Sequence, residues 1–263
     1  MKKCSFAALL IVGALAAGPA LSCTVFLVAR DGRVLAGNNE DWTDPDTKIW
    51  FVVEEGETRY GRVYFGFGNW FPQGGMNEKG LFFDGLALGG KQDAKPESRR
   101  KFAGNLIDEA MRTCATVDEV VALFEKWDFG AGNAQLMFGD ATGDSVVAER
   151  TTFHRKEGDF QVSTNFRLSR QTPEESGCHR YAAAARTLSE SEEATLDVAR
   201  DALRASQQRI TVYSNVYDLA TGDVYLWLNH DFEKVVRFNL LEELEKGSRK
   251  HELPAFFAER LDR

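Results

Sequence analysis

The stretch that decides the fold is CTVFLVARDGRVLAGNNEDW, residues 23–42. Two short apolar runs, TVFLVA and VLAG, flank the tetrapeptide Arg-Asp-Gly-Arg at 30–33. Asp-Gly between such runs is a strong signal for a tight β-hairpin. A hairpin brings its second strand back beside the first, so the polar end of the stretch, including Asn39 and Asp41, is expected to return to Cys23.

Residues 1–22, MKKCSFAALLIVGALAAGPALS, precede this stretch. Early lysines, an apolar run and small residues before Cys23 are the three parts of a secretory signal, and the apolar run is too short to span a bilayer comfortably. We expect removal of residues 1–22 to leave residues 23–263 as a single domain of a secreted or periplasmic protein. Cys23 would then be its first residue.

A cysteine at the amino terminus carries a thiol and a free α-amine on the same residue. Their ordinary pKa values are about 8.5 and about 7.7–8.0, so proton transfer from thiol to amine is nearly isoenergetic at neutral pH. Cys23 is therefore a candidate nucleophile with its own base, and Asp41 a candidate to hold the ammonium. Asn39 is a candidate to bind substrate or water. Without Cys23, the same residues would indicate only an ordinary polar strand end.

The rest of the chain alternates strand-rich and helical blocks. Ala-Thr-Gly-Asp turns divide the segments 135–149 and 210–228 into further strand pairs. A capping box of Thr116 and Glu119 marks one helix start. The sequence predicts an α+β fold, with two sheets sandwiched between helices as one arrangement. Helices are expected at 102–114, 117–127, 179–189 and 194–206, with a charged surface helix within 242–263.

Composition and charge exclude several classes of function. With 263 residues, of which 43% are hydrophobic, the chain can bury one sizeable core. The formal net charge is −8, and it becomes −10 for residues 23–263, because residues 1–22 contain two lysines and no acidic residue. Such an acidic chain is not expected to bind nucleic acid.

Ligand-binding patterns are also informative. The four histidines show no metal-ligand spacing, so neither a metal nor another cofactor is expected. No stretch after residue 22 is apolar enough to span a membrane, so membrane contact is expected only if Cys23 is lipidated. Whether the chain forms a homo-oligomer is left open.

The exported chain would hold three cysteines, Cys23, Cys114 and Cys178. An oxidising compartment favours pairing two of them, and Cys114 with Cys178 is the natural pair. Two buried thiols are the equally weighted alternative, because free cysteine packs as a small hydrophobic residue.

Several motifs in order give the chain a resemblance to a known group. The Cys-Thr start, the hairpin, Asn39-x-Asp41, Met-Asn-Glu-Lys-Gly-Leu at 76–81 and Thr164-Asn165 resemble the choloylglycine hydrolase and penicillin V acylase group. The resemblance runs from Cys23 to about Phe232. More broadly, the chain is similar to the cysteine N-terminal-nucleophile hydrolases, which cut linear amides.

The resemblance implies a four-layer αββα fold and a role for individual residues. Cys23 corresponds to the nucleophile, Asp41 to the carboxylate that positions it, and Asn165 to an oxyanion-hole donor. It also implies hydrolysis of a small N-acyl amide through a thioester on Cys23. The aromatic residues between 50 and 71 are expected to wall an apolar acyl pocket.

The chain departs from the family pattern in three places. Asn38 stands where many members have an arginine, and Ala87 stands near the position of a second oxyanion asparagine. The family's late arginine is matched best by Arg209, with Arg180 as the second choice. Two alternatives therefore remain: a surface lipoprotein lipidated at Cys23, or a binding protein on the same fold.

Overall fold

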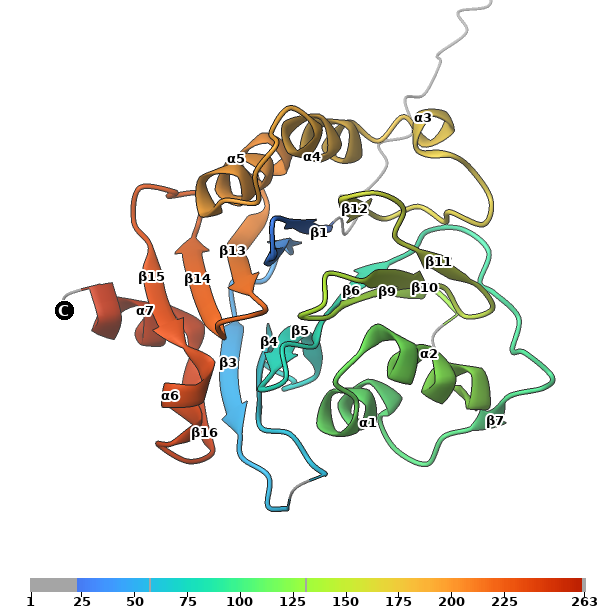
Figure 1. The fold of residues 1–263 in the computed structure, drawn as a ribbon, viewed down its shortest axis with the longest axis horizontal. Coiled ribbons are helices and arrows are strands. Elements are labelled where there is room, and N and C mark those ends of the chain that lie inside the picture. Colours follow the sequence, from blue (N-terminus) through green and yellow to red (C-terminus); the bar gives the residue numbers. More distant parts are fainter. Residues whose placement is uncertain (1–22, 57, 131, 262–263) are drawn as a thin grey trace, which may run out of the picture.

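The computed structural model describes residues 23–56, 58–130 and 132–261. The predicted signal segment, residues 1–22, lies outside the described residues. Two antiparallel sheets form the centre of the molecule (Figure 1). The six-stranded sheet runs in the order β12 (Phe160–Ser163), β1 (Thr24–Arg30), β2 (Arg33–Asp41), β13 (Thr211–Asp218), β14 (Asp223–Leu228), β15 (Val236–Asn239). The eight-stranded sheet runs in the order β11 (Phe153–Arg155), β10 (Ser145–Ala148), β9 (Ala134–Gly139), β6 (Phe82–Ala87), β5 (Pro72–Asn77), β4 (Arg62–Phe67), β3 (Thr47–Val52), β16 (Arg249–Glu252).

The predicted first hairpin is confirmed as β1 and β2. Asp31 and Gly32 form its turn with φ values of 50° and 78°, the left-handed region that a two-residue hairpin turn of this hand requires. The register places Thr24 opposite Asn39, so Cys23, just before β1, falls beside Glu40.

Two pairs of helices cover the outer faces of the sheets and complete four layers in the order αββα (Figure 1). Apolar side chains of each pair share a core cluster with one sheet. The fold predicted from the sequence is therefore confirmed. The eight-stranded sheet is covered by α1 (Leu106–Thr113) and α2 (Val117–Lys126), and the six-stranded sheet by α4 (His179–Ser189) and α5 (Leu196–Ser206). The predicted capping box of Thr116 and Glu119 starts α2.

Alternation along the strands decides what faces the interior between the sheets. In β1, Val25 and Leu27 lie in the cluster between the two sheets, whereas Phe26 and Val28 face α4 and α5. Cys23 belongs to the inward-facing row. Its thiol therefore points between the sheets and not toward the helices.

The carboxyl-terminal segment differs from the surface helix that its charge predicted. It forms α6 (Leu240–Leu244), the edge strand β16 and α7 (Leu253–Leu261). Leu253, Phe256 and Phe257 are buried in the core between the sheets. The segment closes one end of the sandwich. Burial of these three apolar side chains stabilises this position, although most residues of the segment are charged or polar.

Cys114 and Cys178 are both free, so the disulfide is not formed and the alternative of separate thiols holds. Cys114 caps the end of α1 and packs with the cluster under α1 and α2. Cys178 precedes α4 in the opposite outer layer and accepts a hydrogen bond from Thr164 Oγ1 at 3.3 Å. The two sheets separate these positions, and only Cys114 is fully buried.

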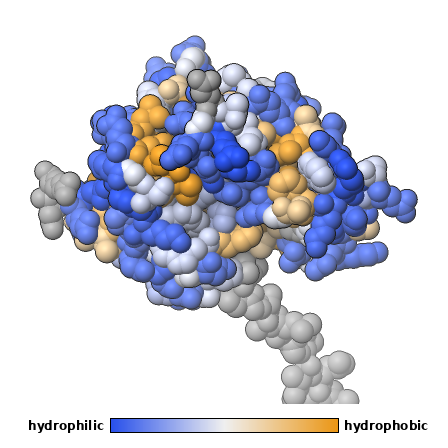
Figure 2. Space-filling view, turned by 90° about the horizontal axis from the view of Figure 1, so that it is seen from below, coloured by the Kyte–Doolittle hydropathy of each residue, from blue (hydrophilic) through white to orange (hydrophobic). Residues whose placement is uncertain are grey.

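The remaining elements are short: the helix α3 (Pro173–Ser176) and the parallel pair β7 (Arg100–Lys101) and β8 (Trp127–Asp128). The face shown in Figure 2 is mostly hydrophilic, with hydrophobic residues in separate small groups. Among the residues that the structure describes, no helix is long and apolar enough to cross a membrane.

Candidate active site

Cys23 lies in a pocket of about 340 Å³ where strand ends of both sheets meet. Cys23 is 6% exposed, and its Sγ donates to Glu40 Oε1 across 3.6 Å. The lining carries four carboxyl groups and no Lys, Arg or His side chain. Its residues are Cys23, Glu40, Asp41, Trp42, Asp44, Asp46, Phe67, Gly68, Asn69, Gln73, Gly85 and Ala87.

The surroundings of the thiol favour its neutral form. Burial raises the pKa of Cys23 well above its ordinary value, and the charges of Glu40, Asp84 and Asp41 raise it further. A hydrogen bond from the backbone amide of Asp41 acts in the opposite direction. The thiol is therefore protonated at neutral pH.

Glu40 is the side chain in contact with that proton. Its Oε2 accepts hydrogen bonds from Asn38 Nδ2 and Tyr213 Oη, both at 3.4 Å. Burial raises the pKa of Glu40 to about 7, although these hydrogen bonds favour its ionised form. Glu40 is therefore poised to change protonation near neutral pH. No sequence pattern distinguishes Glu40, because an acidic residue at a strand end is ordinary.

Asp84 reaches the same interior from β6 of the opposite sheet. Its side chain is completely buried, and neither carboxyl oxygen has a hydrogen-bond partner among the described residues. Burial and the charge of Glu40 raise the pKa of Asp84 well above its ordinary value. Gly74, opposite Asp84 on β5, makes room for it: a β-carbon there would lie 2.2 Å from Asp84 Oδ2.

Asp41 lines the Cys23 pocket, but its side chain is anchored on the helix side of β2. Its two carboxyl oxygens accept hydrogen bonds from Thr211 Oγ1 and, at 2.7 Å, from Gln208 Nε2. Burial raises the pKa of Asp41 to about 6. Asp41 thus has a fixed orientation in the lining of the Cys23 pocket.

The predicted substrate-binding residues Asn39 and Arg209 are not brought to the thiol. Asn39 faces α5, where its Nδ2 donates to Leu203 O at 2.8 Å and its Oδ1 accepts from Ser214 Oγ. The alternation of β2 turns it away from the row that holds Glu40, so its role is to attach the helix layer. Arg209 is exposed in the turn before β13 and is not among the residues lining the Cys23 pocket.

Arg180, the second choice, is the arginine that contacts Cys23. It lies in α4, is 6% exposed, and donates through Nη1 to Cys23 O and, at 3.1 Å, to Thr24 Oγ1. Its Nη2 donates to Asn165 Oδ1 at 3.2 Å, and Asn165 Nδ2 donates to Ala87 O at 2.7 Å. Arg180 therefore joins the strand of Cys23 to the predicted oxyanion residue.

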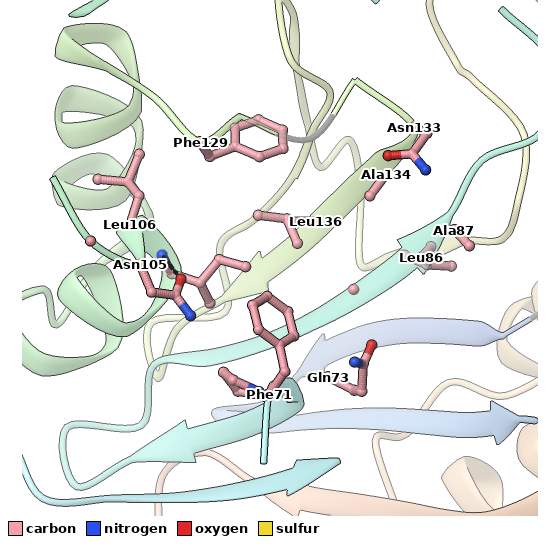
Figure 3. Close-up of a pocket in the computed structure, with 14 residues that line it drawn as sticks. Phe71, Gln73, Leu86, Ala87, Asn105, Leu106, Phe129, Asn133, Ala134 and Leu136 are labelled. Carbon is pink, nitrogen blue, oxygen red and sulfur yellow. Dashed lines mark hydrogen bonds between the residues drawn. The ribbon is translucent and has the colours of Figure 1, made fainter. Parts of the chain in front are cut away.

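A second pocket, of about 420 Å³, adjoins the first and is mainly apolar (Figure 3). The two pockets share Gln73, Gly85 and Ala87 in their linings. Its apolar side chains come from β6, β9, α1 and the segments just before β5 and just after β8. They include Phe71, Leu86, Leu106, Ile107, Phe129 and Leu136.

The aromatic segment 50–71 supplies less of this wall than predicted. Phe71 lines the apolar pocket and Phe67 the Cys23 pocket. Phe51 and Phe65 lie in the core between the sheets, and Trp50 lies under α1 and α2. Within the described ranges, no group of three or more His, Cys, Asp or Glu side chains could hold a metal ion.

No protein-family model and no curated protein matches the chain, but solved structures do. Penicillin V acylase from Agrobacterium tumefaciens has a TM-score of 0.59 and 15% identity over 84% of this chain and 86% of that one. A variant of the conjugated bile acid hydrolase from Clostridium perfringens has a TM-score of 0.63 and 17% identity, covering 87% of this chain and 96% of that one. The N-acylethanolamine-hydrolyzing acid amidase ortholog of Caenorhabditis elegans has a TM-score of 0.57 and 15% identity over 75% of this chain and 93% of that one.

These likenesses concern the fold. Three acylases and amidases share the four-layer arrangement of this chain over most of their length. At 15–17% identity they agree with the fold implied by the sequence resemblance and say nothing about the substrate.

Proposed function

We propose that the protein hydrolyses the linear amide bond of a small N-acyl substrate, with the thiol of Cys23 as nucleophile. One observation carries this proposal. Cys23 lies in a pocket that shares Gln73, Gly85 and Ala87 with a neighbouring apolar pocket. The amidases and acylases of the same fold support it.

The reaction would proceed through a thioester. Sulfur attacks the amide carbonyl, the tetrahedral oxyanion collapses with release of the amine, and water then cleaves the thioester. The free α-amine of Cys23 is the proposed base, available once residues 1–22 are removed. Asn165 is the proposed oxyanion donor, because its amide lies against Ala87 in the pocket wall and Arg180 fixes its orientation.

The two pockets suggest how a substrate is placed. The apolar pocket suits the acyl chain. Leucine and phenylalanine side chains line a cavity of about 420 Å³, and burial of a hydrocarbon chain there contributes favourably to the binding free energy. The carboxyl-rich Cys23 pocket would then receive the scissile bond and the amine side. In this proposal the protein acts outside the cytoplasm, where the signal segment would send it.

Intact mass spectrometry tests the function directly. Protein that begins at Cys23 is incubated with N-acyl amino acids, N-acyl homoserine lactones, bile-salt conjugates and penicillin V. We expect an acyl mass retained by the wild type and by Cys114→Ala, the matched thiol control, but not by Cys23→Ala. If no amide leaves an acyl mass or releases its amine, the proposal is overturned.

The same measurement separates the two alternatives. A lipoprotein would show the mass of a lipid on Cys23 after export. A binding protein on this fold would hold an amide without cleaving it or forming a thioester.

A further inference from the structure

Two carboxyl groups from opposite sheets meet beside the nucleophile, and the sequence resemblance assigns no role to either. Glu40 comes from β2 and touches the thiol, and Asp84 comes from β6. We propose that Glu40 is a catalytic residue that accepts the thiol proton of Cys23 during acylation, leaving the α-amine to serve the leaving nitrogen and the water. This inference rests on the proposed amide hydrolysis and changes the acceptor of one proton.

Geometry favours Glu40 as the acceptor. The thiol is directed at Glu40 Oε1 at 3.6 Å, which is within hydrogen-bond range for sulfur. The other oxygen of Glu40 is held by Asn38 and Tyr213, so the carboxyl group cannot swing away without losing both bonds. A proton acceptor must be within hydrogen-bond reach of its donor, and Glu40 meets this condition before substrate arrives.

Charge favours the same route. The Cys23 pocket is lined with carboxyl groups, and its lining holds no Lys, Arg or His side chain that could stabilise a thiolate. Transfer from the thiol to ionised Glu40 moves one buried negative charge by a few ångströms and creates no new charge. Transfer to a neutral amine would instead create two charges in a buried site, which costs desolvation energy.

Asp84 and Glu40 form a buried pair that holds only one negative charge. Two fully buried carboxyl groups whose charges repel each other are not expected to ionise together at neutral pH. Burial and the charge of Glu40 keep Asp84 protonated, whereas hydrogen bonds from Asn38 and Tyr213 favour ionisation of Glu40. The titratable groups that face Glu40 are Cys23 just before β1, Asp41 from its own strand, Tyr213 and Tyr217 from β13, and Asp84 from β6.

The proton transfers balance over a full cycle. In acylation, the S–H bond breaks, Glu40 gains the proton, sulfur bonds to the carbonyl carbon, and the α-ammonium gives a proton to the departing nitrogen. In deacylation, the neutral α-amine takes a proton from water as the oxygen attacks the thioester. The thiolate released then recovers its proton from Glu40, so the products are the carboxylic acid and the amine.

Glu40→Gln provides a test with two readouts of opposite sign. The substitution keeps the size of the side chain and removes the charge that hinders thiolate formation. Alkylation of Cys23 by iodoacetamide at pH 8 is expected to become about tenfold faster, the effect of one unit in the thiol pKa. Acylation by an amide is expected to fall by about 10²–10⁴-fold, the range for loss of a general base.

The other outcomes each overturn the inference. A rise in both rates would mean that Glu40 acts only through its charge, and a fall in both would mean that it only maintains the structure. If Glu40→Gln turned over amides as fast as an active wild type while Cys23→Ala was inactive, Glu40 would not be the proton acceptor. The proposed amide hydrolysis would still hold. An inactive wild type would remove the proposed function itself.

The pH dependence of acylation by the wild type is a second test. It can be measured even if Glu40→Gln does not fold. Acylation is expected to rise through a group near 7 and fall through the α-ammonium near 8, whereas an amine acting alone as base gives a single rise. Glu40→Asp retains a carboxyl group and should keep the rising limb at a lower rate. Glu243→Gln is the matched control. Glu243 is a buried glutamate in α6 that forms ion pairs with Arg249 and Arg260, and this variant should keep both the rise and the fall of the pH profile. A wild-type profile without the falling limb would contradict the scheme.

Discussion

The two neighbouring pockets differ completely in character although they share three residues. The Cys23 pocket gathers four carboxyl groups, with Asp84 buried close behind them. The apolar pocket has no charged side chain in its lining. The difference suggests a division of labour, in which the first pocket sets the rate for every substrate and the second selects among acyl groups.

The largest effect is expected from blocking the amino terminus. A protein that retains Ser22 has an amide in place of the α-amine of Cys23, so it loses the group that serves the leaving nitrogen and the water. We expect it to fold but to be nearly inactive toward all amides, as is Cys23→Ala. Steady-state turnover and circular dichroism measure the two properties. Full activity with Ser22 present would show that the amine is not required.

Asn165→Ala should produce the next largest loss. Removal of one oxyanion donor costs other enzymes about 10²–10³-fold in kcat, or about 3–4 kcal/mol. The loss should be similar for short and long acyl chains, because Asn165 is not among the residues that line the apolar pocket. A loss confined to long chains would place Asn165 in substrate selection.

The acidic pocket should also reduce the stability of the protein at neutral pH. The pKa of Glu40 is about 7 in the folded protein and 4.5 as its ordinary value, so the unfolded chain gives up this proton first. The contribution of Glu40 to stability is therefore intact below about pH 4.5 and is lost as the pH rises to about 7. Denaturant unfolding of wild type and Glu40→Gln should diverge over this range, by on the order of 3 kcal/mol. Parallel curves would contradict the assignment.

The smallest effect concerns the apolar pocket. Phe71 is 46% exposed, so Phe71→Ala should leave the fold intact while removing part of the wall. We expect kcat/KM for long acyl chains to fall about tenfold, equivalent to about 55 Å² of lost apolar burial, with acetyl substrates unaffected. Val53→Ala, an exposed apolar residue that lines neither pocket, is the control. Equal losses for acetyl and long chains would contradict the division of labour.

Much of the fold could be predicted because its signals are local. The Asp31-Gly32 turn, the capping box at Thr116 and the periodicity of four helices each depend on neighbouring residues, and the structure contains all of them. The carboxyl-terminal segment could not be predicted in the same way. Its strand and its buried phenylalanines exist only because β3 and the sheet interior are there to receive them.

The site was predictable only in part, since strand alternation and distant contacts decide it. Asn39 and Glu40 are adjacent in sequence but face opposite sides of β2, and the hairpin register determines which one meets Cys23. Arg180 lies 157 residues from Cys23, and no local pattern favours it over Arg209. No sequence pattern marks Asp84 as a site residue, because only the stacking of the two sheets brings it near the thiol.

Gly74 and Asp84 also give a rule for comparing this chain with other sequences. The carboxyl group occupies the volume that a β-carbon at position 74 would need, and the closest approach would be 2.2 Å. A chain that keeps the buried acid at 84 must therefore keep glycine at 74, whereas one that loses the acid is free to place alanine there. Joint variation of these two positions would show in which lineages a carboxyl group stands behind the nucleophile.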